Sequence, residues 1–197
     1  MSPGVTFERV YFALKRMLTE RELPPGTPIE PAHIGRQIAA SITPVRDALH
    51  RLTGERLVEA PNHNGFRVPL PTETALRDLY QWNGQLLGLA VKAMRFEPEE
   101  VSTGGGTRQD DIGTATAALF LRIAAATGSD EHAKAIALLN DRLAPFRRVE
   151  GELLNDLAVE LTRLREATED STQLARLITA YHRRRARMVS DILSFKG

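Results

Sequence analysis

The segment SITPVRDALHRL, residues 41–52, combines hydroxyl and guanidinium side chains at the start of an amphipathic pattern. The hydroxyls of Ser41 and Thr43 suit phosphate oxygens, and the guanidinium of Arg46 suits the edge of guanine that accepts two hydrogen bonds. The free N–H groups at a helix start also attract anions. These residue types at this spacing predict nucleic-acid binding, unless they only face solvent, as the outer face of most surface helices does.

A short helix must position these side chains. Thr43 before Pro44 is typical of an N-cap residue followed by proline in the first helical position. We expect Arg46, His50 and Arg51 on the exposed face of this helix. The other face is predicted to be buried, because apolar residues recur there at helical spacing: Val45, Ala48, Leu49 and Leu52.

Two earlier helices are expected to support this one. Apolar residues from Val10 to Leu18 recur with a helical period, which predicts a helix that ends near Arg21. The LPPGTPI segment that follows cannot be helical because prolines fix extended backbone, and Ile29 within it predicts a short strand. A second helix is expected to begin at Pro31.

A hairpin is predicted after the third helix. Residues Leu57–Glu59 and Phe66–Val68 have strand-like character, and the PNHNG segment between them contains an Asn-Gly pair, a strong turn signal. Such a turn is ordinary by itself, but three helices followed by a hairpin predict a winged helix-turn-helix. Its wing would offer hydrogen-bond donors to phosphates from the tip, Asn62, His63, Asn64 and Gly65, and from Arg67 behind the tip.

The run ELPPGTPIEPAHIGRQIAASITPVRDALHRLTGERLVEAPNHNGFRV resembles the DNA-binding domain of the GntR family of bacterial transcription regulators. The PPG turn, the TPVRDAL motif and the wing glycine occur in the family's order and at its distances. The resemblance implies DNA contacts from the third helix and the wing. The expected DNA-binding residues are Ser41, Thr43, Arg46, His63, Asn64, Gly65 and Arg67.

Two positions depart from the family pattern. The arginine that follows the serine in the family is Ile42 here, and the arginine near the start of the second helix is Ala32. Each phosphate that a cation neutralises adds to the salt dependence of binding. We therefore expect weaker attraction to phosphate and a flatter salt dependence than in relatives that keep both arginines.

The rest of the chain is predicted to be helical, apart from the polar and Gly-rich segment EPEEVSTGGGTRQDD, which predicts a mobile loop. The fold class is therefore mainly α, with a winged helix-turn-helix over residues 1–72 and an all-α bundle over residues 73–197. The expected helices of the bundle are 73–94, 112–127, 131–150 with a kink at Pro145, 152–167 and 171–194.

The bundle is similar, more faintly, to the effector domain of the FadR-like (FCD) branch of the same family. Many members of that branch bind a divalent metal through one Asp and three His. Here Thr116 and Phe120 stand at the positions of the Asp and the first His, and Val159 or Glu160 stands near the second. Only His182 remains. One imidazole cannot supply the four to six ligands of such a metal, so no metal cofactor is expected.

A small-molecule effector site in the bundle is a further implication of the resemblance. Its expected residues are Asn83 and His182, where Asn83 stands in place of an arginine in the family and Leu87 in place of a glutamate. His182 could instead be a satisfied residue of the bundle interior, as most buried polar groups are. His132 is expected to be a surface residue at a helix start.

Composition excludes several classes of protein. The 197 residues contain no cysteine, which excludes disulfides, thiolate metal sites and a cysteine nucleophile. No apolar run suggests a membrane span, and MSPGVTFERV does not resemble a signal peptide, so a cytoplasmic protein is expected. Residues 1–72 contain nine Lys or Arg and seven Asp or Glu, so bulk charge alone does not predict a nucleic-acid partner.

The sequence as a whole predicts a bacterial transcription regulator that binds a palindromic DNA operator as a homodimer, as a repressor that responds to a small molecule. Two alternatives remain: a helical module whose wing binds a partner protein, or a helical enzyme that acts through a pocket residue such as His182. An enzyme is the weaker of these, because GGGT at residues 104–107 lacks the Lys of a phosphate loop and no HExxH or Gly-x-Ser-x-Gly motif is present.

Overall fold

The computed structural model describes residues 3–61, 65–94 and 109–195, and all their side chains except those of 3–5 and 109–111. The chain divides into two compact units, Met1–Pro71 and Thr72–Gly197. Each unit has its own buried apolar core. Within the described ranges, no helix has the length and apolar character that crossing a membrane requires.

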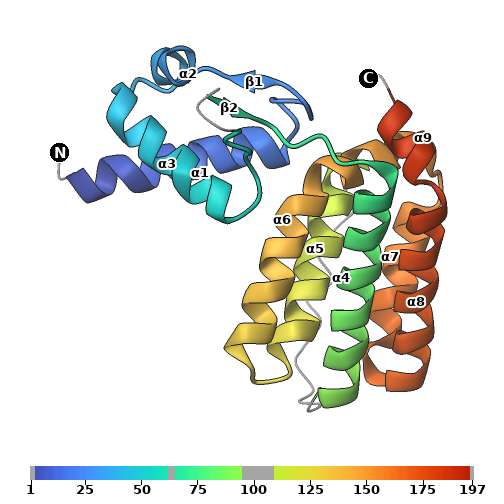
Figure 1. The fold of residues 1–197 in the computed structure, drawn as a ribbon. Coiled ribbons are helices and arrows are strands. Elements are labelled where there is room, and N and C mark those ends of the chain that lie inside the picture. Colours follow the sequence, from blue (N-terminus) through green and yellow to red (C-terminus); the bar gives the residue numbers. More distant parts are fainter. Residues whose placement is uncertain (1–2, 62–64, 95–108, 196–197) are drawn as a thin grey trace. The chain divides into compact units, whose positions relative to one another are not determined.

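The described residues of the first unit form three helices and two short strands (Figure 1). The predicted winged helix-turn-helix is confirmed. In chain order the elements are α1 (Pro3–Thr19), β1 (Pro28–Ile29), α2 (Pro31–Gln37), α3 (Ile42–Gly54) and β2 (Phe66–Arg67).

Helix α3 begins two residues earlier than the sequence predicted. Its N-cap residue is Ser41 rather than Thr43, and the Ser41 side chain makes no capping hydrogen bond. Pro44 still lies in the first turn, where it is tolerated because an N–H at that position would have no acceptor within the helix. The predicted inner face is fully buried, with Val45, Ala48, Leu49 and Leu52 all at 0% exposure.

Strand β2 of the wing pairs mainly with β1, which follows the PPG turn, and less with the predicted strand Leu57–Glu59. Strand β2 is antiparallel to β1, with Ile29 opposite Phe66, and Leu57–Glu59 contributes only a single bridge from Glu59 to Arg67. The reason is local: the backbone N–H groups of residues 57 and 58 donate to the carbonyl of Leu52 and close the end of α3. Those donors are therefore not available for a strand ladder.

Gly26 fixes the turn before β1. Its φ of +85° lies in the left-handed region that favours glycine, and its N–H donates to the carbonyl of Val68 at 3.0 Å. The Val68 N–H donates in turn to the carbonyl of Thr27 at 2.9 Å. The PPG turn thus anchors the base of the wing.

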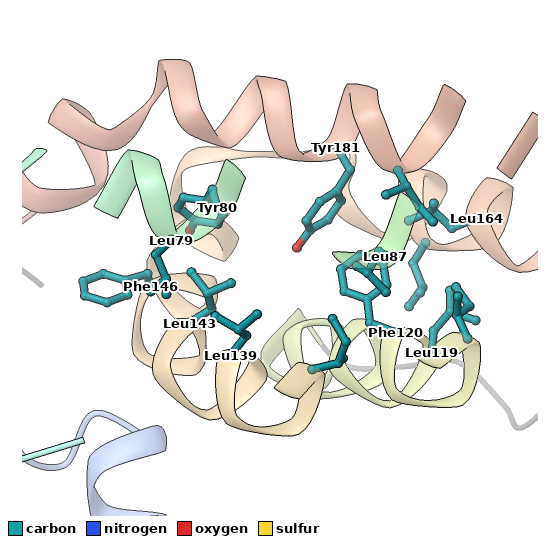
Figure 2. Close-up of a cluster of buried hydrophobic side chains, with 14 of the residues drawn as sticks. Leu79, Tyr80, Leu87, Leu119, Phe120, Leu139, Leu143, Phe146, Leu164 and Tyr181 are labelled. Carbon is teal, nitrogen blue, oxygen red and sulfur yellow. The ribbon is translucent and has the colours of Figure 1, made fainter. Parts of the chain in front are cut away.

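The second unit is a helical bundle, and Figure 1 shows α4, α5, α6 and α8 running side by side. Its core gathers leucines and aromatic rings from these helices (Figure 2). The elements are α4 (Glu73–Ala93), α5 (Gln109–Ala125), α6 (Asp130–Leu153), α7 (Leu157–Glu166), the 3-10 helix η1 (Ala167–Glu169), α8 (Ser171–Arg187) and α9 (Val189–Ser194).

Several boundaries in the bundle differ from the prediction. Helix α6 continues through Pro145 to Leu153, so the next helix, α7, starts only at Leu157. The predicted last helix is two helices, because the Met188 N–H donates to the carbonyl of Arg185, three residues back, and ends α8. Most of the predicted loop at 97–111 lies outside the described residues.

Candidate functional site

The start of α3 presents free polar groups. The side chains of Ser41, Thr43 and Arg46 are exposed, and none of them has a hydrogen-bond or ionic partner within the described part of the chain. The rigid buried face of the helix holds them on the outer side of the unit. Two hydroxyls and one guanidinium are therefore free to bind a ligand at the end of a helix that itself attracts anions.

The two other residues expected on this face have partners inside the unit. The His50 ring lies edge-on to the Phe66 ring, with centroids 5.0 Å apart, so it joins α3 to the wing. The Arg51 guanidinium lies over the Tyr11 ring at 4.2 Å from its centroid, and its Nε is 3.3 Å from Glu55 Oε1. Of these three side chains, Arg46 is the one that has no partner within the described structure.

The turn before α3 is held by an arginine from α1. Arg9 donates from Nη1 to the carbonyl of Ile38 at 2.8 Å and from Nη2 to the carbonyl of Ala39 at 3.1 Å. Ala39 has a φ of +50°, a conformation that few non-glycine residues adopt. These bonds satisfy carbonyls at the end of α2 and fix the direction in which α3 leaves the turn.

Gly35 lets this turn approach α2, which leads to a stability prediction. A Cβ at Gly35 would lie 2.7 Å from the Ala40 carbonyl oxygen, a backbone atom that cannot move alone. We expect Gly35→Ala to lower the free energy of unfolding by about 1–3 kcal/mol through overpacking. Chemical denaturation monitored by circular dichroism measures this change.

The matched control is Gly54→Ala at the end of α3, where a Cβ would meet nothing within 4 Å. There we expect no loss of stability, because alanine favours a helix more than glycine does. Equal losses at both positions would show that the close approach at Gly35 is not the cause.

The wing presents one predicted cation that is already paired. Arg67 Nε is 2.9 Å from Glu59 Oε2, across the bridge that joins the two residues. Gly65 is exposed and has a φ of +80°, as a tight hairpin turn requires. His63 and Asn64 lie outside the described residues. Of the four wing residues expected to contact DNA, the structure therefore describes two: Gly65, which is exposed, and Arg67, whose guanidinium is paired with Glu59.

Sequence reasoning missed a further free cation on α2. Ala32, where the family has an arginine, is half-buried, whereas Arg36 one turn later is exposed and has no partner among the described residues. Positions four apart share a helix face. The same spacing in the sequence could have indicated Arg36 as a replacement for the missing charge. Ile42, which stands in place of the other arginine, is 48% exposed.

In the bundle, Asn83 and His182 meet in the interior. His182 Nε2 is 2.7 Å from the side-chain amide of Asn83, and its Nδ1 is 2.7 Å from the carbonyl of Ile178. Both atoms that face the ring nitrogens are oxygens, the carbonyl of Ile178 and Oδ1 of Asn83, and a neutral ring has one N–H, so it donates to one of the two. The Asn83 Nδ2 has no hydrogen-bond partner among the described residues.

His182 stays neutral because it is buried. Burial lowers its pKa to about 3, and the nearby cations Arg147 and Arg185 act in the same direction. The ring also stacks on Phe120, with centroids 5.5 Å apart. Asn83 and His182 thus pair with each other in the interior, and His182 also borders the groove between α4 and α8.

This pKa leads to a pH prediction. The unfolded chain takes up a proton on His182 near pH 6.5 and the folded protein does not, so stability is complete above pH 6.5 and falls as the pH is lowered towards 3. Between pH 7 and pH 5 we expect a loss of about 2 kcal/mol from this group. Urea unfolding at both pH values measures it.

His182→Gln should remove most of this pH dependence. His33→Gln, on the exposed side of α2, is the matched control and should leave the dependence as in the wild type. A His182→Gln protein that keeps the full dependence would assign it to other groups.

Thr116 and Phe120, which stand at two of the metal positions of the resembled branch, are buried in the bundle. Thr116 donates its hydroxyl to the carbonyl of Ile112 at 2.8 Å, and Phe120 is fully buried. No group of three or more His, Cys, Asp or Glu within the described ranges could hold a metal ion. His132 is half-buried rather than a surface residue, since its ring Nε2 bonds to the carbonyl of Leu86 at 2.8 Å.

Buried ions that the sequence did not predict lie between α6, α7 and α8. Arg185, 1% exposed, has its Nε 2.7 Å from Glu150 Oε2 and its Nη2 2.6 Å from Glu160 Oε2. Tyr80 donates to the other oxygen of Glu150 at 2.6 Å. Arg185 continues the apolar stripe of α8 at the position four residues after Tyr181, and that spacing was the signal that it points inward.

A groove between α4 and α8 carries exposed apolar residues. Trp82 and Leu89 are 51% and 54% exposed, and the small residues Gly84 and Gly88 lie between them on α4. His182 closes the floor of the groove against Gly84. Its remaining lining residues are Arg77, Gln81, Gln85, Lys92, Ala175, Thr179, Arg183, Ala186 and Arg187.

Comparison with known proteins concerns the first unit most directly. Residues 6–68 match the model of bacterial regulatory proteins, gntR family. The chain is also 26% identical over 98 residues to YdhC of Bacillus subtilis (strain 168), an uncharacterised HTH-type transcriptional regulator. This match covers 50% of the chain and 44% of YdhC, so it spans less than half the length of that relative.

Solved structures match over both units. A candidate transcriptional regulator GntR from Rhodococcus sp. RHA1 has a TM-score of 0.75 at 16% identity, over 96% of this chain and 99% of that one. E. coli McbR/YncC has a TM-score of 0.66 at 19% identity, over 94% of this chain and 97% of that one. At these identities the likeness concerns the fold, a winged helix-turn-helix followed by a helical bundle.

Proposed function

We propose that this chain, whose residues 6–68 match the model of the gntR family, regulates transcription by inserting the start of α3 into the major groove of an operator. The family is one of DNA-binding regulators and not of enzymes. The observation that carries the proposal is the free guanidinium of Arg46 beside two free hydroxyls, on a helix whose other face is fully buried.

Each group has a role in the proposed complex. Arg46 donates two hydrogen bonds to the O6 and N7 edge of a guanine, while Ser41 and Thr43 bind phosphate oxygens. Arg36 on α2 contacts a neighbouring phosphate and partly replaces the charge that Ala32 lacks. The wing contacts are assigned to His63, Asn64, Gly65 and Arg67.

Two copies of the chain bind a palindromic operator in this proposal. A symmetric dimer fixes the spacing of two recognition helices and so the spacing of the two half-sites. The groove with Trp82 and Leu89 supports a dimer through the helical units, because a second copy would remove this apolar surface from water. Light scattering of the purified chain measures the mass directly.

The helical unit senses a small molecule and changes operator affinity in the proposed function. The chain acts as a repressor, and the ligand enters the bundle near Asn83 and His182. A ligand can shift an equilibrium only by its difference in affinity for the two arrangements. A bound ligand that leaves operator affinity unchanged would remove this part of the proposal.

Fluorescence anisotropy with duplex DNA from upstream of the protein's own gene tests the central claim. We expect specific binding that weakens with salt, by less than in relatives with arginines at positions 32 and 42, since fewer phosphates are neutralised. Measurements at two salt concentrations, with a scrambled duplex as control, give both the specificity and the salt dependence of binding. No preference for the upstream duplex, together with capture of a protein by the wing, would favour a protein-interaction module instead.

A further inference from the structure

The outer side of α4 carries a line of exposed residues with the spacing of a helix–helix contact. We call this line the α4 stripe, and its residues recur four and then three positions apart: Asp78, Trp82, Gln85, Leu89 and Lys92. All five side chains are exposed. Residues at this alternating spacing share one face of a helix, and the same spacing forms the contact face of paired helices.

The opposite side of α4 uses the same spacing to pack into the bundle. Its five residues are all at 0% exposure: Leu76, Tyr80, Asn83, Leu87 and Ala90. Each residue of the α4 stripe follows one of these by two positions, which is about 200° around the helix axis. The α4 stripe therefore points away from the core and stays exposed in the described part of the chain.

The middle of the α4 stripe is apolar. Trp82 and Leu89 are more than half exposed, and Gly84 and Gly88 line the same groove beside them. A Cβ at Gly88 would meet nothing within 4 Å, so the described chain itself does not require a glycine there. Glycine inside a helix is less stable than alanine, and it allows another backbone to approach closely. These features indicate an interaction surface.

The two ends of the α4 stripe carry opposite charges. Asp78 lies seven residues before Gln85, and Lys92 lies seven residues after it. Neither charged group has a hydrogen-bond or ionic partner among the described residues. In an antiparallel pair of stripes centred on Gln85, Asp78 of each copy faces Lys92 of the other. Trp82, three residues before the centre, then faces Leu89, four residues after it. A parallel pair would place like charges together.

We propose that two copies of this chain dimerise through their α4 stripes, packed antiparallel about a two-fold axis at Gln85. Each unlike pair then forms twice, as a symmetric contact requires. The contact from Asp78 to Lys92 is about 21 Å long. Removal of Trp82 and Leu89 from water favours the dimer, and the ion pairs fix its direction and register. The inference rests on the proposed function for its role on DNA, and it names the surfaces that meet.

The α8 side of the groove indicates the alternative occupant. Arg183 and Arg187 are exposed, line the groove, and have no partner among the described residues. An acidic amphipathic helix of another protein would meet these cations together with the apolar residues of the stripe. A second copy is favoured because the stripe supplies both signs of charge, and Asp78 would repel an acidic helix.

Charge reversal in the full chain tests the register, with sedimentation equilibrium over a dilution series as the measurement. Asp78→Lys and Lys92→Asp should each raise the dissociation constant of the dimer about 10-fold, because each variant brings like charges together at both ends. The double variant should restore the dimer, since unlike charges face each other again. Glu166→Lys, the same change at an exposed residue of α7, is the matched control and should dimerise as the wild type does.

The sequence offers two direct reporters of the contact. Trp82 is the one tryptophan of the chain, and the chain has no cysteine. Tryptophan emission should shift to shorter wavelength as the protein is concentrated, because the Trp82 ring leaves water. Gln85→Cys should crosslink to its own copy with a short bismaleimide, because a residue on a two-fold axis meets itself. Thr162→Cys, exposed on α7, is the matched control and should not crosslink.

Three outcomes would overturn the inference. A chain that is monomeric at every concentration would leave the groove to an acidic helix. A double charge variant that dimerises no better than the single variants would exclude the antiparallel register. Dimers with unshifted Trp82 emission and no crosslink through Gln85→Cys would place the contact on another surface.

Operator binding by the same preparations separates this inference from the proposed function. Asp78→Lys should lose affinity for a full palindrome and keep the affinity of the wild type for a single half-site. A dimer through the α4 stripe in a protein that binds no DNA would refute the proposed function alone. Specific operator binding by a protein whose dimer ignores both charge reversals would refute this inference alone.

Discussion

Arg46→Ala should weaken binding to the cognate operator by about 1–3 kcal/mol, which is roughly 5-fold to 150-fold in affinity. In the proposed complex the loss follows from two hydrogen bonds to one guanine, and no other free cation of α3 in the described structure could replace them, because Arg51 lies over Tyr11. Anisotropy with the operator and with a duplex that carries a substituted guanine measures both affinity and discrimination.

The substitution should also relax specificity. The mutant should discriminate less between the two duplexes than the wild type does, since the missing contact is the one that reads the base. Arg16→Ala is the matched control: it removes the same charge from an exposed arginine of α1 that pairs with Glu20 and Glu22. Equal losses on operator and random DNA would mean that Arg46 only contacts phosphate, and an unchanged affinity would refute its role.

Arg185→Met should lower the free energy of unfolding by about 3–5 kcal/mol. The side chain is 1% exposed, and its removal leaves Glu150, 2% exposed, with Tyr80 as its remaining partner. A buried carboxylate without its cation is destabilising because it has lost water and gained no charge in return. Urea unfolding followed by circular dichroism measures the change.

Two further variants identify the cause. Arg184→Met, at the next residue, removes a partly exposed ion pair with Asp156 and should cost about 0–1 kcal/mol. Adding Glu150→Gln to Arg185→Met should restore part of the loss, because the unpaired charge is then gone. A double variant as unstable as Arg185→Met would point instead to the lost packing of the arginine side chain.

Arg147 of α6 and Arg185 of α8 are both buried, but they differ in the partners that the protein supplies to their guanidinium groups. Arg185 holds three helices together through two carboxylates, and the protein supplies every partner. Arg147 has one neutral partner from the protein and two unused donors. The first contributes to stability, whereas the second leaves Nε and Nη2 without a hydrogen-bond partner in the described part of the chain.

The sequence predicted the elements of the first unit well because their causes are local. Helical periodicity, the PPG turn and the Asn-Gly pair act within a few residues, and they indicated three helices and a wing. The boundary errors have local causes as well. Ser41 rather than Thr43 caps α3, and the chain at Leu57 closes that helix instead of extending as a strand.

The sequence did not predict which groups each polar side chain contacts. The sequence could place Arg46, His50 and Arg51 on the outer side of one helix, but only the tertiary structure brings Tyr11 to Arg51 and Phe66 to His50 and leaves Arg46 free. Periodicity reports which way a side chain points and says nothing of what another element places against it.

By itself, the sequence determined the mainly helical fold and the winged helix, since these follow from residue types and short spacings. Only the tertiary structure decided that Asn83 pairs with a neutral His182 and that Glu150 and Glu160 both bind Arg185. It also decided that Nε and Nη2 of Arg147 have no hydrogen-bond partner among the described residues. The reason is physical: the cost of a buried charge depends on the atoms around it, and those atoms come from helices far apart along the chain.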